Sequence, residues 1–186
     1  MRHLYFCLKA GLAAALLFAL ASNATAENAA TAPAGLQGWK SSAPASFRLD
    51  DLHGQPRDLQ AFKGKVVLLH FFATWCEPCV AEIASLQRLT SIMRGQPLAV
   101  VAIDVAEIDL KVRAFFEKNP ADFAVLLDRD RAIARSWKIS ALPSTVVLDP
   151  ELSPRLFVEG DLDWSRPDIV TTLKALYPAG ASAGGK

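Results

Sequence analysis

The stretch Ala73-Thr74-Trp75-Cys76-Glu77-Pro78-Cys79 directly follows Val66–Phe72, a run that is apolar at nearly every position. Such a run predicts a strand buried on both faces, which is typical of parallel or mixed sheets. From Glu77 to Met93 the apolar residues recur at the spacing of one helix face. The two cysteines are therefore expected where a buried strand passes into a helix, and this junction decides the fold.

From this junction outward, strands and helices alternate along the chain. The predicted elements are a hairpin over 46–59, strands over 97–104, 123–127, 145–148 and 156–158, and helices over 109–118, 130–137 and 168–176. Because helices separate most of the strands, this order predicts an α/β domain with a central mixed sheet flanked by helices.

The two ends of the chain differ in composition from the middle. Residues 1–26 combine basic residues, a short apolar run and the small residues Ala24-Thr25-Ala26, which is typical of a secretory signal peptide; an uncleaved N-terminal anchor is the alternative. We expect a flexible linker over 27–45, one domain over 46–178 and a disordered tail over 179–186. Either interpretation of the N-terminus places the folded part outside the cytoplasm, and we expect the periplasm.

Charge and cysteine content reduce the number of function classes that fit the chain. The formal net charge is +1 at pH 7 and the basic residues form no cluster, so we expect no nucleic-acid partner. Of the three cysteines, Cys7 lies in the predicted signal peptide, which leaves Cys76 and Cys79 in the mature chain. A bond between two such close cysteines closes a very short loop and stabilises the fold little through chain entropy. The two cysteines are therefore expected to be reactive groups and not a structural cross-link.

The position of the pair at a predicted helix start supports that chemistry. A helix N-terminus carries partial positive charge, which favours the thiolate of Cys76, and the thiolate is the form that attacks a disulfide. Cys79 falls within the first turn, where it can resolve a mixed disulfide by attacking Cys76. Pro78 tolerates the first helical turn and is expected to hold the two sulfurs in a repeatable geometry. No cofactor other than the redox-active disulfide is expected.

Further motifs surround the cysteine pair. They are Phe47-x-Leu49-x-Asp51-Leu52-x-Gly54, Phe62-Lys63-Gly64-Lys65, Leu142-Pro143-Ser144-Thr145 and Gly160-Asp161-Leu162-Asp163-Trp164. With these residues, from Ser46 to Tyr177, the chain resembles the TlpA/ResA-like thioredoxin-fold reductases of bacterial envelopes. The resemblance implies a thioredoxin fold with an N-terminal β-hairpin and an inserted segment, a redox-active Cys76–Cys79 disulfide, and a cis peptide bond between Leu142 and Pro143.

The resemblance also implies partners and a setting. They are client proteins with disulfides, an upstream membrane thiol donor and an envelope location, and cytochrome c maturation is one role that it suggests. The resemblance favours a reducing role, whereas the residues alone leave the direction of electron flow open, because the potentials of Cys-x-x-Cys proteins span ~150 mV. We expect the protein to act as a monomer.

Four side chains near the pair are candidates for supporting roles. Glu82 lies one turn beyond Cys79, and in the family an acid at this place is thought to assist proton transfer; the alternative is a solvated helix glutamate. Glu77 is expected to tune the redox poise, and Trp75 to form a flat rim where polypeptide docks. His70 stands where the family usually has Asn or Asp, and is either a proton relay or a satisfied core histidine.

Three other functions were weighed. A metal (copper) chaperone or binding module would find only two ligands in one Cys-x-x-Cys pair, whereas a closed zinc site needs four, so we expect no metal. A peroxiredoxin-like peroxidase needs a threonine three residues before the cysteine, and this chain has Ala73 there. A non-catalytic module with a structural disulfide is the third, and the Trp-Cys-Glu-Pro-Cys context argues against it.

Overall fold

The computed structural model describes residues 35–177 of the chain. The predicted signal peptide, the first part of the predicted linker and the predicted tail lie outside these residues. Within residues 35–177, no helix combines the length and the apolar composition that crossing a bilayer requires.

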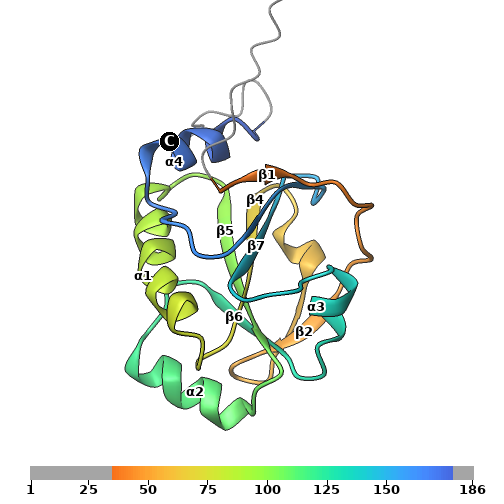
Figure 1. Cartoon of the computed structure of the whole chain (residues 1–186), viewed down its shortest axis with the longest axis vertical. Coiled ribbons are helices and arrows are strands. Elements are labelled where there is room, and N and C mark those ends of the chain that lie inside the picture. Colours follow the sequence, from red (N-terminus) through yellow and green to blue (C-terminus); the bar gives the residue numbers. More distant parts are fainter. Residues whose placement is uncertain (1–34, 178–186) are drawn as a thin grey trace, which may run out of the picture. The chain divides into compact units, whose positions relative to one another are not determined.

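Eight strands form one mixed sheet in the order β1-β8-β7-β4-β5-β6-β2-β3 (Figure 1). They are β1 (Gln37–Gly38), β2 (Arg48–Asp51), β3 (Pro56–Asp58), β4 (Val66–Phe72), β5 (Leu98–Val105), β6 (Ala124–Asp128), β7 (Ser144–Leu148) and β8 (Pro154–Glu159). Strands β4, β5 and β6 are parallel, and the other pairings are antiparallel. Every residue of β4 is buried, as the apolar run predicted.

Helices cover both faces of the sheet. They are η1 (Leu59–Phe62), a 3₁₀ helix, and α1 (Glu77–Ile92), α2 (Asp109–Lys118), α3 (Ala132–Ser136) and α4 (Pro167–Lys174). Successive strand side chains point to opposite faces, so Leu68 of β4 packs with α1 and α4, whereas Leu69 packs with Trp137 at the end of α3. Figure 1 accordingly shows α1 and α3 on opposite sides of the strands.

The segment inserted between β5 and α3 forms one wall of the cysteine region. It consists of α2 and β6, and β6 extends the sheet by pairing in parallel with β5. Phe116 of α2 meets Phe72 edge to face, with 5.8 Å between the ring centroids. Phe116 also belongs to the buried cluster that contains Cys76 and Cys79, so the insertion encloses the pair.

Most predicted elements are confirmed with ends that shift by a few residues, and the range of α2 agrees at both ends. The expectation of a flexible linker up to residue 45 is wrong for its described part. Gln37 and Gly38 pair with β8 as the strand β1, and Leu36 is buried. Trp39 packs against Trp137, with 6.1 Å between the ring centroids. A two-residue strand shows no periodicity, and its aromatic partner lies far along the chain, so composition alone suggested a linker.

Candidate active site

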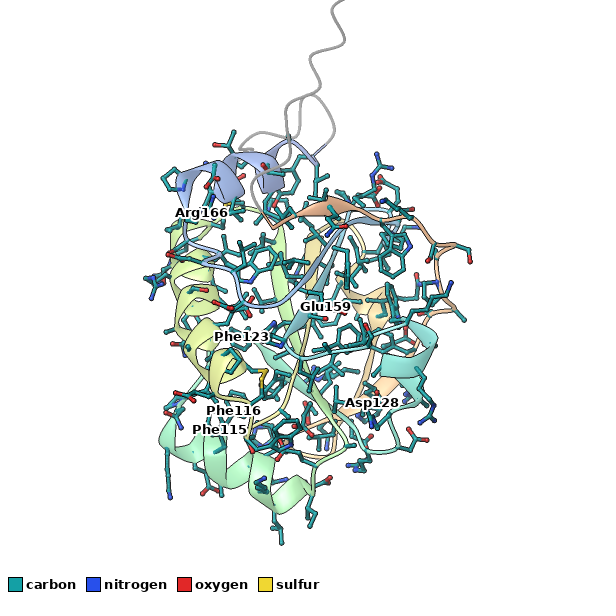
Figure 2. The ribbon with its side chains drawn as sticks, in the orientation of Figure 1. Phe115, Phe116, Phe123, Asp128, Glu159 and Arg166 are labelled. Atoms are coloured by element: carbon teal, nitrogen blue, oxygen red, sulfur yellow. A yellow bond between two sulfur atoms is a disulfide. The ribbon has the colours of Figure 1, made fainter. Side chains whose placement is uncertain are left out.

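The turn between β4 and α1 sets the geometry of the cysteine pair. The backbone N–H of Cys76 donates to the carbonyl of Ala73 at 3.2 Å and closes this turn. Cys76 is the N-cap residue of α1, and its Sγ accepts a hydrogen bond from the backbone N–H of Cys79 at 3.3 Å. The two cysteines form a disulfide, seen in Figure 2 as the yellow bond at the beginning of α1. A sulfur in this position lies at the positive end of the helix dipole and accepts a hydrogen bond from one of the free N–H groups of the helix.

The two sulfurs differ in access to solvent. Cys76 retains 6% exposure, whereas Cys79 is fully buried. Pro78 and Glu77 are exposed in the first turn of the helix. A partner molecule can therefore approach the pair from the side of Cys76.

The peptide bond between Leu142 and Pro143 is cis, as the family resemblance implied. Pro143 immediately precedes β7, and its carbonyl accepts the backbone N–H of Gly160 at 2.9 Å. Leu142 packs against the buried cluster that contains both cysteines. This segment is thus fixed beside the disulfide.

Glu82 is a buried residue of α1, 4% exposed, and not a solvated helix glutamate. Its Oε1 accepts a hydrogen bond from Nε1 of Trp164, and its Oε2 has no hydrogen-bond partner. Burial raises the pKa of Glu82 to about 8, with a further rise from the charge of Asp161 and an opposing contribution from the Trp164 hydrogen bond. The carboxyl group is therefore mostly protonated at neutral pH.

His70 lies beside Glu82 in the middle of β4 and is fully buried. Its Nδ1 is 3.0 Å from the hydroxyl oxygen of Thr145 on β7 and 4.0 Å from Oε1 of Glu82. Burial lowers the pKa of His70 to about 3, so the ring is neutral at physiological pH. His70 and Glu82 are thus neighbouring uncharged groups and do not form an ion pair.

A second acidic cluster holds the turn that precedes Cys76. The carboxylate of Glu107, in the loop between β5 and α2, accepts hydrogen bonds from the backbone N–H and the hydroxyl of Thr74, the latter at 2.8 Å. Lys111 donates to the same carboxylate at 2.8 Å. Behind it, the buried carboxyl group of Asp104 accepts the backbone N–H of Glu107 at 3.2 Å.

Three exposed apolar side chains lie in the turn before Cys76 and in the segment that follows Glu107. Trp75 is 67% exposed, Ile108 is 74% exposed and Leu110 is 75% exposed. Trp75 adjoins Thr74 and Ile108 adjoins Glu107, so the hydrogen bonds between Thr74 and Glu107 bring the two exposed side chains to the same end of the molecule.

The sequence pointed to the disulfide, the cis proline and Glu82. The structure has the disulfide at the start of α1, Leu142 of the cis bond packed against the buried cluster of both cysteines, and Glu82 buried three residues after Cys79. It did not single out Asp104 or Glu107, and it named Trp164 only as part of a motif, without a role. Asp104 carried a signal: an acidic residue inside a run of apolar strand residues indicates a buried carboxyl group. Glu107 carried none, because its partner Thr74 is 33 residues away in the chain.

The fold and the site define a class of protein. A mixed sheet whose central strand passes into a helix capped by a Cys-x-x-Cys disulfide, with a cis proline fixed beside it, is the arrangement of the thioredoxin-fold thiol–disulfide oxidoreductases.

Known proteins carry the same pattern. The AhpC/TSA family model matches residues 40–153. The thiol–disulfide oxidoreductase ResA of Bacillus subtilis (strain 168) is 35% identical over 106 residues, which cover 57% of this chain and 59% of that protein. ResA of Geobacillus kaustophilus (strain HTA426) is 30% identical over 138 residues, which cover 74% and 78%. The chain belongs to the AhpC/TSA family and to its ResA/TlpA-like thioredoxin-fold relatives.

Solved structures share the fold. A thiol:disulfide interchange protein of the thioredoxin family from Chlorobium tepidum TLS superposes with a TM-score of 0.62 at 23% identity, over 73% of this chain and 99% of that one. A secreted thiol-disulfide isomerase from Corynebacterium glutamicum superposes with a TM-score of 0.66 at 22% identity, over 75% and 91%. The thioredoxin fold expected from the sequence is confirmed.

Proposed function

We propose that this protein reduces disulfide bonds of client proteins outside the cytoplasm, through a mixed disulfide on Cys76. The observation that carries the proposal is the asymmetry of the cysteine pair. Cys76 caps the helix and retains 6% exposure, whereas Cys79 is fully buried. Because the helix terminus favours the thiolate of the accessible sulfur, the pair has a defined nucleophile and a defined resolving group.

The reaction has two exchange steps. The Cys76 thiolate attacks one sulfur of the client disulfide, forms a bond between Cys76 and the client, and releases the other client sulfur as a thiolate. Cys79 then loses its proton and attacks the Sγ of Cys76, which releases the second client thiolate and leaves the Cys76–Cys79 disulfide. Two electrons pass to the client, and an upstream dithiol donor must return two electrons to the pair.

Glu82 supplies the base for the second step. Cys79 is fully buried, so its thiol proton has no direct route to bulk water. Glu82 follows Cys79 by three residues in the same helix, so the two side chains lie on neighbouring positions of one face. With a pKa raised to about 8, the fraction of Glu82 that is ionised near neutral pH is a stronger base than an ordinary carboxylate. The neutral ring of His70 gives Glu82 a polar neighbour that does not fix its charge.

The exposed residues around the pair recognise the client. Trp75 offers a flat, exposed apolar face next to Cys76, and the half-buried Leu142 packs against the cluster that holds both cysteines. Glu77 places a negative charge between the two cysteines, where it opposes the Cys76 thiolate and so tunes the redox poise of the pair.

The location and the partners follow from the ends of the chain and from relatives. The signal-peptide pattern over 1–26 supports export to the periplasm, and a structural neighbour is described as secreted. Client proteins with disulfides and a membrane thiol donor are the partners that suit the reaction. Cytochrome c maturation is one pathway that would use such a reductase.

The test is a trapping experiment. A Cys79→Ala variant cannot resolve the mixed disulfide, so envelope proteins with cysteines should accumulate as adducts on Cys76 that dithiothreitol releases. Cys76→Ala is the matched control and should trap none. If Cys79→Ala yields no adduct in an envelope extract or with a model peptide disulfide, the reductase assignment is wrong. The reduction potential of the wild-type pair, measured against glutathione, then determines the direction: a potential above that of the compartment would make the protein an oxidant.

A peroxidase is the second candidate, because the AhpC/TSA family match includes the site. The hydroxyl of Thr74, the nearest threonine in sequence, donates to Glu107 and is therefore occupied. We expect the reduced protein to consume hydrogen peroxide no faster than ordinary thiols do. Stopped-flow oxidation of the reduced protein, with Cys76→Ala as the blank, checks this expectation.

A further inference from the structure

The turn that precedes Cys76 is held by a side chain from the loop between β5 and α2. In the turn from Ala73 to Cys76, the central residues are Thr74 and Trp75, and no backbone acceptor receives the N–H of Thr74. The carboxylate of Glu107 instead accepts this N–H at one oxygen and the Thr74 hydroxyl at the other. One side chain from the β5–α2 loop thus accepts both hydrogen-bond donors of a turn residue two positions before the nucleophile.

The Glu107 carboxylate is itself enclosed and held from two sides. Its side chain is 4% exposed, and Lys111 of α2 donates to it at 2.8 Å. Burial alone would raise the pKa of Glu107, but the hydrogen bonds from Lys111, Asp104 and Thr74 outweigh it and lower the pKa. The group is therefore a carboxylate at neutral pH and accepts both bonds from Thr74.

Asp104 is the acidic neighbour of this carboxylate. It is 1% exposed on β5, and its Oδ2 accepts no hydrogen bond. Burial and the adjacent Glu107 carboxyl group raise the pKa of Asp104 to about 8, so this acid is protonated at neutral pH. Lys111 is the cation that faces the pair from α2. On β6, the carboxylate of Asp128 caps the N-terminus of α3 through the N–H groups of Ile133 and Ala134 and does not face the pair.

We propose that Glu107 is a positioning residue of the redox site, which fixes the turn at Thr74 so that Cys76 and Trp75 are presented to the client in one geometry. Asp104 and Lys111 keep the Glu107 carboxylate in place. This proposal rests on the proposed function, because positioning matters only if Cys76 attacks disulfides. It assigns to the inserted segment, which contributes Glu107 and Lys111, a part in catalysis as well as in packing.

The principal test is Glu107→Gln. Glutamine has one carbonyl oxygen and one amide nitrogen, so it cannot accept both hydrogen bonds from Thr74. We expect the second-order rate of Cys76 attack on a model peptide disulfide, measured in the Cys79→Ala background, to fall about tenfold, because small displacements of a nucleophile have large kinetic effects. The reduction potential and the ratio of KM to kcat in the full reaction should shift as well. Glu117→Gln removes the same charge from an exposed position of α2 and is the matched control.

A second measurement reports directly on the hydrogen bond from the Thr74 N–H to Glu107. Hydrogen exchange of the Thr74 amide should be slow in the wild type and fast in Glu107→Gln. In the wild type its protection should decrease as the pH rises through about 8, when Asp104 loses its proton beside the carboxylate, and Asp104→Asn should remove this decrease. If Glu107→Gln is too unstable to study, Thr74→Val removes the hydroxyl bond alone, and we expect about a threefold lower rate.

The outcomes separate the two proposals. A wild-type protein that does not exchange with disulfides overturns the proposed function, whatever the Thr74 amide does. A wild-type protein that does exchange, with Glu107→Gln equal to it in rate, overturns the positioning role, whether or not the amide protection is lost. A lower melting temperature with an unchanged rate at 25 °C would likewise reduce Glu107 to a structural residue.

Discussion

Two buried acidic clusters lie next to the disulfide, and they differ in how their charge is balanced. The cluster behind Cys79 consists of Glu82, the neutral Trp164 that donates to it, and the neutral ring of His70 beside it. The cluster beside Cys76 consists of Glu107 and Asp104 with Lys111 in contact. Glu82 therefore holds its proton at neutral pH, whereas Glu107 is ionised and its proton-bearing partner is Asp104.

The difference shows that burial alone does not determine what a carboxyl group does in this site. A buried acid without a cation has a pKa near the working pH and can exchange a proton. A buried acid with a lysine and strong donors keeps its charge and can hold other groups in position. The first cluster suits the step that needs a base, and the second suits the step that needs an aligned nucleophile.

The largest expected effect is on stability. Burial raises the folded-state pKa of Glu82 from 4.5 to about 8, so the stability that the neutral carboxyl group contributes is fully present below pH 4.5 and is lost as the pH rises through about 8. Between these limits the wild type should lose about 3–5 kcal/mol relative to Glu82→Gln, since one pKa unit corresponds to about 1.4 kcal/mol. Urea unfolding of both oxidised proteins at pH 4, 6 and 9 measures the gap. A gap that does not change with pH would mean that folding does not raise the pKa of Glu82.

The next effect separates the two steps of the reaction. Glu82→Gln should slow resolution of the mixed disulfide by Cys79 about a hundredfold, because it removes the general base. It should leave the initial attack by Cys76 close to the wild-type rate. Single-turnover kinetics with a fluorescent peptide disulfide resolve the two phases. If Glu82→Gln and Glu107→Gln slow the same phase, the division of labour between the clusters is wrong.

A smaller effect is expected from the donor to Glu82. Trp164→Phe removes the Nε1 hydrogen bond that favours the ionised carboxylate, and so raises the pKa of Glu82 further. The resolving step should become about tenfold slower at pH 7, with its pH profile displaced to higher pH. Trp137→Phe is a matched control, because Trp137 is equally buried and its Nε1 has no hydrogen-bond partner. Equal slowing in both variants would point to loss of packing instead of loss of the hydrogen bond.

The smallest effect concerns the cation. Lys111→Met removes the charge in contact with Glu107, but Lys111 is 56% exposed and solvent screens the interaction. We expect the attack by Cys76 to slow about twofold to threefold at low ionic strength, and the difference from the wild type to shrink at 1 M salt. A loss as large as that of Glu107→Gln, or one insensitive to salt, would show that the lysine acts through packing.

The sequence predicted the elements that carry strong local signals. The apolar run of β4 and the helical spacing of α1 fixed the junction where Cys76 and Cys79 lie, and the order of the elements fixed the α/β architecture. The cis bond at Pro143 was implied by family resemblance and not by its local sequence. These features depend on neighbours in the chain or on a pattern that recurs among relatives.

The rest depends on contacts between distant residues. Glu82 and Trp164 are 82 positions apart, and Thr74 and Glu107 are 33 apart, so no local pattern links them. Whether a glutamate acts as a general base or as a positioning residue depends on its burial and on one nearby lysine. Spacing along the chain determines neither of these. The sequence did not predict the strand β1 for the same reason, because Trp39 contacts Trp137 only in the folded protein.

The short strand β1 has one more consequence, which concerns self-association. By pairing with β8 it occupies backbone groups at one end of the sheet, and at the other end β3 has Pro56 and two charged residues. Exposed strand edges invite the addition of further strands, and prolines, charges and short edges discourage it. The two-residue length of β1, and the proline and charges of β3, therefore discourage an extended client or a second copy of the chain from adding a strand at these edges.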